Sequence, residues 1–206
     1  MPGWQRFAET HQNAAFELIA IAIDHQGAEA ARPFVEAARA TYPVLVDADG
    51  ALSAALGFKV VPNGLLVDEA GIVRYARYGG FDVALPEDVA TVERFIAGGD
   101  PGPSPDVKTP YALGSLQRQL VETKLRLGRA LDELGRRAEA IAAWREALRF
   151  DPENLTIRKQ IWSAEHPEKF HPVIDWDWQR RQLRDERERE IAEGICGPDG
   201  CPIPWV

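Results

Sequence analysis

The sequence predicts an α/β domain, a mixed sheet with flanking helices, followed by an all-helical segment. Up to about residue 98, short runs rich in Val, Ile and Leu alternate with Ala-rich stretches whose apolar residues recur at helical spacing. Residues 99–110 are rich in Pro and Gly, which helix and strand interiors do not favour. From residue 111 onward the patterns are helical. We therefore expect a domain at 1–98, a linker at 99–110, a helical segment at 111–165 and a charged, aromatic tail at 166–206.

The elements of the first domain follow from local patterns. Residues 16–24 form a near-continuous apolar run, which is typical of a strand buried on both faces. Residues 69–71 lie between two apolar runs and predict the turn of a hairpin. The predicted strands are residues 16–24, 43–47, 64–68 and 72–78. The predicted helices are residues 27–41, 51–56 (closed by Gly57) and 86–97 (with Pro86 at its start).

The charge and hydropathy of the chain narrow its classes of partner. The net charge is −8, and phosphate binding needs a basic face, so we expect no nucleic-acid partner. The chain has no run of 18 apolar residues, and Met1 is not followed by a basic segment and an apolar stretch. We expect no membrane partner and a cytoplasmic location for the chain as given. An extracytoplasmic location stays open if an export signal precedes Met1.

The stretch Phe58–Val73, which reads FKVVPNGLLVDEAGIV, resembles the thioredoxin superfamily and most closely its TlpA/ResA-like redoxins. The resemblance implies a thioredoxin-like mixed sheet and thiol–disulfide oxidoreductase activity on protein thiols or disulfides. It implies that Pro62 is a cis-proline facing the redox site, and that Val61 offers its backbone to an extended substrate. Asn63 departs from the family, which usually has Thr after this proline.

The same resemblance implies a strand and a C-x-x-C motif ahead of a helix whose second half resembles Met1–Glu9. The helix N-terminus lowers a cysteine's pKa, and no cysteine of this chain can occupy that place. The absent strand is expected centrally, between the strands at 16–24 and 64–68. We therefore expect the domain to be incomplete at its N-terminus. The alternative is a chain that folds as given, with the sheet closed directly and no catalysis there.

The helical segment resembles a tetratricopeptide repeat over the 34 residues from Val121 to Asn154. The residues that carry this resemblance take the small, large and turn positions of the unit: Leu127, Gly128, Gly135, Ala140, Trp144, Ala147 and Pro152. Residues 111–119 are expected to form an incomplete preceding helix, and residues 155–164 a following one. Because a lone repeat cannot bury its apolar face, we expect it either to bind a protein partner or to pack within the protein.

The tail carries the chain's only two cysteines, Cys196 and Cys201, around a Pro-Asp-Gly turn signal. Three interpretations of these two cysteines are open: a redox pair, half of a metal site or an inert pair. Two thiolates alone do not satisfy zinc, and His166 and His171 are poorly placed to help, so we predict no metal and no cofactor.

The aromatic part of the tail is expected to bury Phe170, Trp176 and Trp178. The charged helix at 179–193 is expected to present a solvated face.

These observations lead to two main hypotheses of different classes. The first is a TlpA-like thiol–disulfide oxidoreductase joined to a protein-binding tetratricopeptide segment and lacking its nucleophile in this chain. Under it, Val61 and Pro62 shape the substrate site, and Cys196 and Cys201 take part in electron transfer. The second is a non-catalytic adaptor built on a degenerate thioredoxin scaffold. A peroxidase is a third option, because the two folds share this half of the domain.

Overall fold

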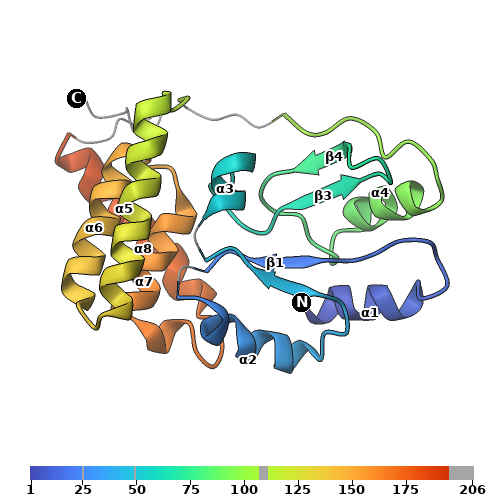
Figure 1. The fold of residues 1–206 in the computed structure, drawn as a ribbon, viewed down its shortest axis with the longest axis horizontal. Helices are drawn as coiled ribbons and strands as arrows, with labels where there is room; N and C mark the ends of the chain where they lie inside the picture. The colour runs from blue at the N-terminus through green and yellow to red at the C-terminus, as the bar shows by residue number, and fades with distance from the viewer. Residues whose placement is uncertain (25, 49, 107–110, 195–206) are drawn as a thin grey trace. The chain divides into compact units, whose positions relative to one another are not determined.

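The structure is a computed structural model that describes residues 1–24, 26–48, 50–106 and 111–194 (Figure 1). The chain divides into two compact units, Met1–Val107 and Lys108–Val206, which we describe separately. Among the described helices, none combines the length and the apolar character needed to cross a lipid bilayer.

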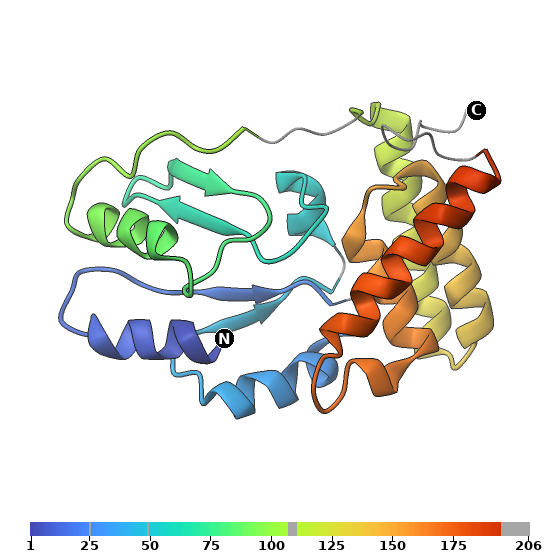
Figure 2. The ribbon, with the colours of Figure 1, turned by 180° about the vertical axis from the view of Figure 1, so that it is seen from behind.

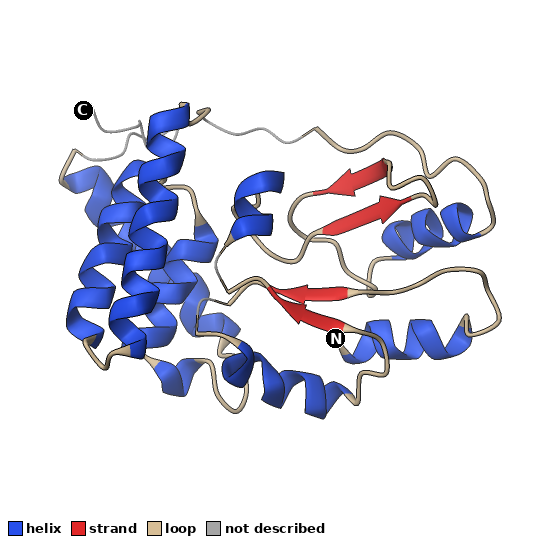
Figure 3. Ribbon diagram, in the orientation of Figure 1, coloured by secondary structure: helices blue, strands red, loops and turns tan. Residues whose placement is uncertain are grey.

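The first unit contains two separate two-stranded sheets (Figure 3). Strands β1 (Ala20–Ala22) and β2 (Val44–Val46) pair in parallel. Strands β3 (Gly64–Val67) and β4 (Val73–Arg77) pair in antiparallel fashion as a hairpin. Within the described residues, no ladder joins β1 to β3. The alternative, in which the sheet closes directly, is therefore wrong for the described residues. The sheet is interrupted between the two strands that were expected to flank an absent one.

Four helices accompany these sheets: α1 (Pro2–Thr10), α2 (Ala28–Ala38), α3 (Ala51–Leu56) and α4 (Pro86–Ile96). Local chemistry explains their ends. The carboxylate of Asp47, just after β2, accepts hydrogen bonds from the backbone N–H groups of Leu52 and Ser53, so it holds the first turn of α3. Gly57 ends α3 in the left-handed conformation, with φ of 70°.

The core of the first unit joins α1, the hairpin and α4. Its buried members are Phe7, Leu66, Tyr75, Phe81 and Val92. Leu66 and Tyr75 are register partners in β3 and β4, so they lie on the same face of the hairpin. That face is therefore the one covered by α1 and α4.

The predicted strand at 16–24 is much shorter in the structure, since only Ala20–Ala22 pairs with a neighbour. A strand extends as far as ladder partners are available, and β1 has a partner on one side only. The predicted burial on both faces is also wrong, because the side chain of Ile21 is 41% exposed.

The second unit is helical (Figure 2). Its elements are α5 (Ser115–Glu133), α6 (Arg137–Phe150), α7 (Leu155–Glu165), the 3₁₀ turn η1 (Pro167–Lys169) and α8 (Trp176–Ala192). The expected separate helix at 111–119 is wrong, because Ser115 already begins α5 and no break separates it from residue 121. Nothing in this stretch interrupts the backbone ladder, since it contains no Pro after residue 110.

Helices α5, α6 and α7 pack around Trp144, whose side chain is fully buried. Its indole N–H donates to the backbone carbonyl of Leu125, at 3.3 Å. Gly128 of α5 allows this close approach, because a Cβ there would lie 2.2 Å from Trp144 Nε1. Gly135, with φ of 74°, makes the turn between α5 and α6.

Two expectations for the tail are corrected. Trp176 is 54% exposed and stands at the first position of α8, where the Lys159 ammonium lies 5.3 Å from its ring centroid. Phe170 and Trp178 are half-buried, and Trp178 packs edge-on against Trp162. The charged face of α8 is also not wholly solvated, because the carboxylates of Glu186 and Glu190 bond side chains of α7.

Candidate functional site

The loop that carries Val61 and Pro62 leads directly into β3. The Val61–Pro62 peptide bond is cis, Pro62 is exposed and Val61 is half-buried. Asn63 fixes this loop from both ends of its amide: Nδ2 donates to the carbonyl of Val60, at 2.7 Å, and Oδ1 accepts from the N–H of Gly79, at 2.8 Å. The loop is thereby tied to the segment that follows β4.

Aromatic packing joins this loop to helix α1. The N–H of Phe81 donates to the carbonyl of Pro62, at 3.3 Å. The Phe81 ring stacks on Trp4 of α1, with centroids 5.3 Å apart and planes 14° from parallel. Gly64 leaves room for the ring, because a Cβ there would lie 2.3 Å from it. The residues that the resemblance assigns to the substrate side are therefore held against the N-terminal helix.

Helix α1 is anchored beneath the sheet by a buried amide. Gln5, which is 4% exposed, accepts a hydrogen bond from the backbone N–H of Thr41, at 2.8 Å, and donates to the Thr41 hydroxyl. Partial burial lowers the pKa of the α-amino group of Met1. The start of α1 is thus packed against the segment that precedes β2.

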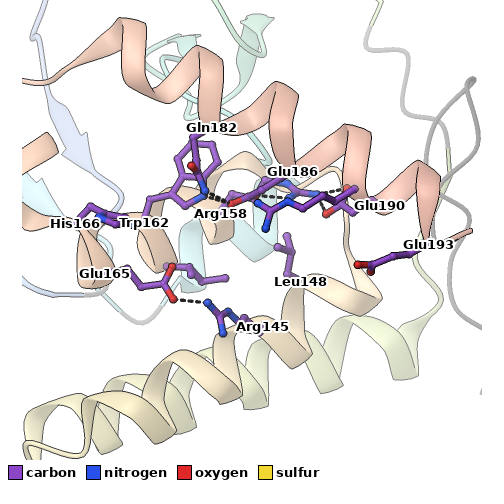
Figure 4. Close-up of a pocket in the computed structure, with 12 residues that line it drawn as sticks. Arg145, Leu148, Arg158, Trp162, Glu165, His166, Gln182, Glu186, Glu190 and Glu193 are labelled. Atoms are coloured by element: carbon purple, nitrogen blue, oxygen red, sulfur yellow. Dashed lines mark hydrogen bonds and ion pairs between the residues drawn. The ribbon is translucent and has the colours of Figure 1, made fainter.

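The second unit contains a groove of about 750 Å³ between α6, α7 and α8 (Figure 4). Its lining combines basic and acidic side chains with the apolar residues Leu148, Ile161 and Trp162. The charged residues are Arg145, Arg158, Glu165, Glu186, Arg189, Glu190 and Glu193.

Arg158 is the centre of the polar contacts in this groove. Its side chain is 1% exposed, and its guanidinium bonds Glu186 at 2.7 Å and Glu190 at 2.6 Å, both on α8. Glu186 also accepts from the indole N–H of Trp162, at 2.6 Å. A buried guanidinium needs carboxylate partners to offset its desolvation, and two of its nitrogens, Nη1 and Nη2, have them. These contacts hold α8 against α7.

Two further groups of the second unit have shifted pKa values. Burial, together with the neighbouring carboxylate of Asp151, raises the pKa of the Tyr111 hydroxyl above its ordinary range. That hydroxyl lies 2.7 Å from Asp151 Oδ1 and accepts from the backbone N–H of Glu153. Burial lowers the pKa of Lys159. Both groups tie the helical unit together, and neither lines the groove.

The structure places only part of the predicted site. Val61 and Pro62 lie together on the loop before β3, whereas Cys196 and Cys201 lie outside the described residues. Sequence reasoning missed Arg158, because its two carboxylate partners are 28 and 32 residues further along the chain. It also missed the role of Asn63, although an amide directly after a loop proline is a signal that could have been used.

Comparison with known proteins gives one match. Residues 1–76, somewhat over a third of the chain, match the AhpC/TSA family. The match supports assignment of these residues to the thioredoxin-like redoxins, and it covers α1, both strands of the first sheet, the Val61–Pro62 loop and β3. No curated protein and no solved structure matches the chain.

Proposed function

We propose, on the premise that residues 1–76 are thioredoxin-like, that the first unit is the frame of a thiol–disulfide oxidoreductase. The observation that carries the proposal is the Val61–Pro62 loop. It lies within the family match and is held rigidly by Asn63 and Phe81. The exposed loop offers a backbone edge to an extended protein substrate.

The chain's only thiols, Cys196 and Cys201, are the proposed redox pair. A thiolate of the pair attacks one sulfur of the substrate disulfide, and the other substrate sulfur leaves as a thiol. The second thiolate then attacks the mixed disulfide, so the pair becomes a disulfide and the substrate a dithiol. Two electrons pass to the substrate, and dithiothreitol restores the pair in an assay.

The test is reduction of insulin disulfides by dithiothreitol, followed by turbidity. The full chain is expected to accelerate the reaction, and the C196S/C201S variant to run at the rate of dithiothreitol alone. Pro62→Ala should slow the full chain by weakening substrate docking while leaving both thiols in place. If the full chain gives no acceleration, the redox proposal fails for this chain and the non-catalytic adaptor is favoured.

Peroxide reduction is a second candidate, favoured by the family that the first unit matches. Here a thiolate attacks the peroxide oxygen, which yields a sulfenic acid and water or an alcohol. The second thiol condenses with the sulfenic acid to give the disulfide and water. Loss of hydrogen peroxide in the presence of dithiothreitol measures this reaction. Consumption that depends on Cys196 and Cys201, without insulin reduction, would select the peroxidase.

For the second unit we propose a tetratricopeptide segment that binds a protein. The packing of Trp144 against Gly128 and the charged groove beside α8 support this reading. Reversing charge in the groove with Arg189→Glu should weaken co-purification of a bound protein. The matched control is Arg184→Glu on the same helix, since Arg184 is exposed and does not line the groove. Equal losses in both variants would contradict binding through the groove.

A further inference from the structure

Helix α5 carries an apolar stripe on the side that is turned away from the core of the second unit. Its buried residues Val121, Leu125 and Gly128 face that core. The stripe lies on the opposite side of the helix, because successive helical residues are turned by about 100°. Its members are spaced alternately four and three residues apart: Leu116, Leu120, Thr123, Leu127, Ala130 and Leu134. This spacing is the heptad pattern of a helix that pairs with another helix.

The leucines of this stripe are open to solvent. Leu116 and Leu134 are 77% and 72% exposed, and Leu127 is 45% exposed. A single exposed leucine is ordinary, whereas leucines in one row along a helix form a continuous apolar surface, which marks an interaction site. Within the described part of the chain, no residue of α5 lines the groove. Helices α5 and α8 lie on opposite sides of the helical unit (Figures 1 and 2), so the stripe and the groove are separate surfaces.

We infer that α5 pairs along this stripe with α5 of a second copy of the chain, with the two helices antiparallel and related by a two-fold axis beside Leu125. A closed two-fold dimer needs a surface that is complementary to itself. The stripe meets this requirement, because its members are placed symmetrically in sequence about Leu125. The pairs that face each other across the axis are Leu116 with Leu134, Leu120 with Ala130, and Thr123 with Leu127.

The sizes of the paired side chains favour this arrangement. Every layer of the antiparallel contact contains a leucine, which faces another leucine or a smaller residue. In a parallel pairing each residue would face its own equivalent, so the layers at Thr123 and Ala130 would contain only small side chains and would be underfilled. The antiparallel order therefore fills the contact more evenly, and a different partner would have to match the same order of large and small residues.

The charges beside the stripe are compatible with a second copy. Lys124 and Arg126 flank the two-fold axis, so each would lie close to its own equivalent. Each already has a carboxylate partner within its chain: Lys124 pairs with Glu146, and Arg126 pairs with Glu122 at 3.3 Å. The axis therefore brings ion pairs together rather than isolated cations, and repulsion at such exposed sites is weak. An occupant with a strong net charge of either sign would find no complementary charge there.

The length of α5 sets the expected strength of the contact. Its 19 residues span about 28 Å, and a single pair of helices of this length lies at the small end of specific interfaces. We therefore expect a reversible dimer that forms at about 100 μM protein and dissociates on dilution.

The test is sedimentation equilibrium of the full chain in dithiothreitol, which keeps Cys196 and Cys201 reduced and prevents disulfide-linked dimers. The full chain is expected to show twice the mass of one chain. The L116E/L134E variant should raise the dissociation constant by about tenfold or more, because it places charge in an apolar contact. The matched control is Val173→Glu, on the loop before α8, where the original side chain is 76% exposed. This variant should dimerise as the full chain does.

A second double variant tests the register. In L116E/L134K, the carboxylate introduced at position 116 of one copy meets the ammonium introduced at position 134 of the other, so dimerisation should exceed that of L116E/L134E. A parallel dimer would place like charges together in both variants. Equal association of the two variants would therefore overturn the antiparallel pairing.

Two further results would overturn the inference. A full chain that stays monomeric at about 100 μM would show that α5 does not pair with a second copy. A dimer that L116E/L134E leaves unchanged would place the contact on another surface. These readouts involve neither redox activity nor the groove beside α8, so failure of the proposed function would leave them unaffected.

Discussion

Trp144 of α6 rests directly on Gly128 of α5, with no room between them for a methyl group. A Cβ at residue 128 would lie 2.2 Å from the indole Nε1 and 2.5 Å from Cδ1. The pair fixes how closely the first two helices of the second unit approach each other.

Gly128→Ala should therefore destabilise the second unit, although Ala is the better helix former. Helix propensity favours Ala by about 1 kcal/mol, but overpacking a buried contact costs about 1–3 kcal/mol. The difference between these two effects is a net loss of up to about 2 kcal/mol in urea unfolding. Arg126→Ala, at an exposed position of the same helix, is the control and should change stability little. Stabilisation by Gly128→Ala would contradict the packing.

Arg158→Met should loosen α8. The change leaves Glu186 and Glu190 without the guanidinium that both contact, and breaking such a buried pair costs about 3 kcal/mol. Urea unfolding and faster hydrogen exchange in α8 measure the effect. The control is Arg180→Ala, which removes an exposed ion pair on the same helix and should cost less than about 0.5 kcal/mol. Similar effects of both variants would show that Arg158 does not anchor α8.

Asn63→Ala should mobilise the Val61–Pro62 loop. The variant removes hydrogen bonds to Val60 and Gly79 at once, with an expected cost of about 1–2 kcal/mol. Asn63→Thr, the residue usual in the resembling family, has a single short hydroxyl and should recover only part of the loss. Hydrogen exchange of Gly79 reports the lost bond. Unchanged exchange at Gly79 would contradict the role of Asn63.

The raised pKa of the Tyr111 hydroxyl predicts that the folded protein loses stability at alkaline pH. An unfolded tyrosine ionises near pH 10, whereas burial and Asp151 raise the pKa of Tyr111 in the folded chain. The folded state therefore binds this proton more tightly. The stability that it contributes is complete below about pH 10 and falls as the pH rises above that value. In Tyr111→Phe this part of the alkaline loss should disappear, as measured by urea midpoints at about pH 8 and pH 11. If the wild type and the variant lose stability equally, the Tyr111 proton is not held by folding.

Much of the fold could be predicted because its signals are local. The short helix at 51–56 lies between two glycines, Gly50 and Gly57, and the hairpin turn is marked by residues 69–71. Helix α7 follows Asn154, whose side chain caps it by accepting from the N–H of Ile157. Such features depend on residues only a few positions apart.

The other features of the fold depend on contacts between residues far apart in the chain, which a local sequence pattern does not record. The length of β1 is set by how many neighbours it has, so an apolar run at 16–24 overstates it. The interruption of the sheet was anticipated only through the family resemblance. The burial of Arg158 depends on carboxylates of α8, in a stretch whose charges read as solvent-facing. Long-range polar pairing leaves little trace in the local spacing of residues.

Amide hydrogen exchange of the full chain, resolved by residue, tests the central claim most directly. That claim is that β1 and β3 each carry one open edge within a thioredoxin-like frame. The N–H of Ala20 donates to Pro43 beside β2, and the N–H of Ala76, opposite Leu65, donates to the Ser104 hydroxyl outside the hairpin. Because backbone groups alternate along a strand, Ile21 and Leu65 face the open edges. The account predicts fast exchange at Ile21 and Leu65, beside slow exchange at Ala20 and Leu66, whose N–H groups face β2 and β4. Slow exchange at Ile21 and Leu65 in dilute, monomeric protein would show that the two edges are already paired and would contradict it.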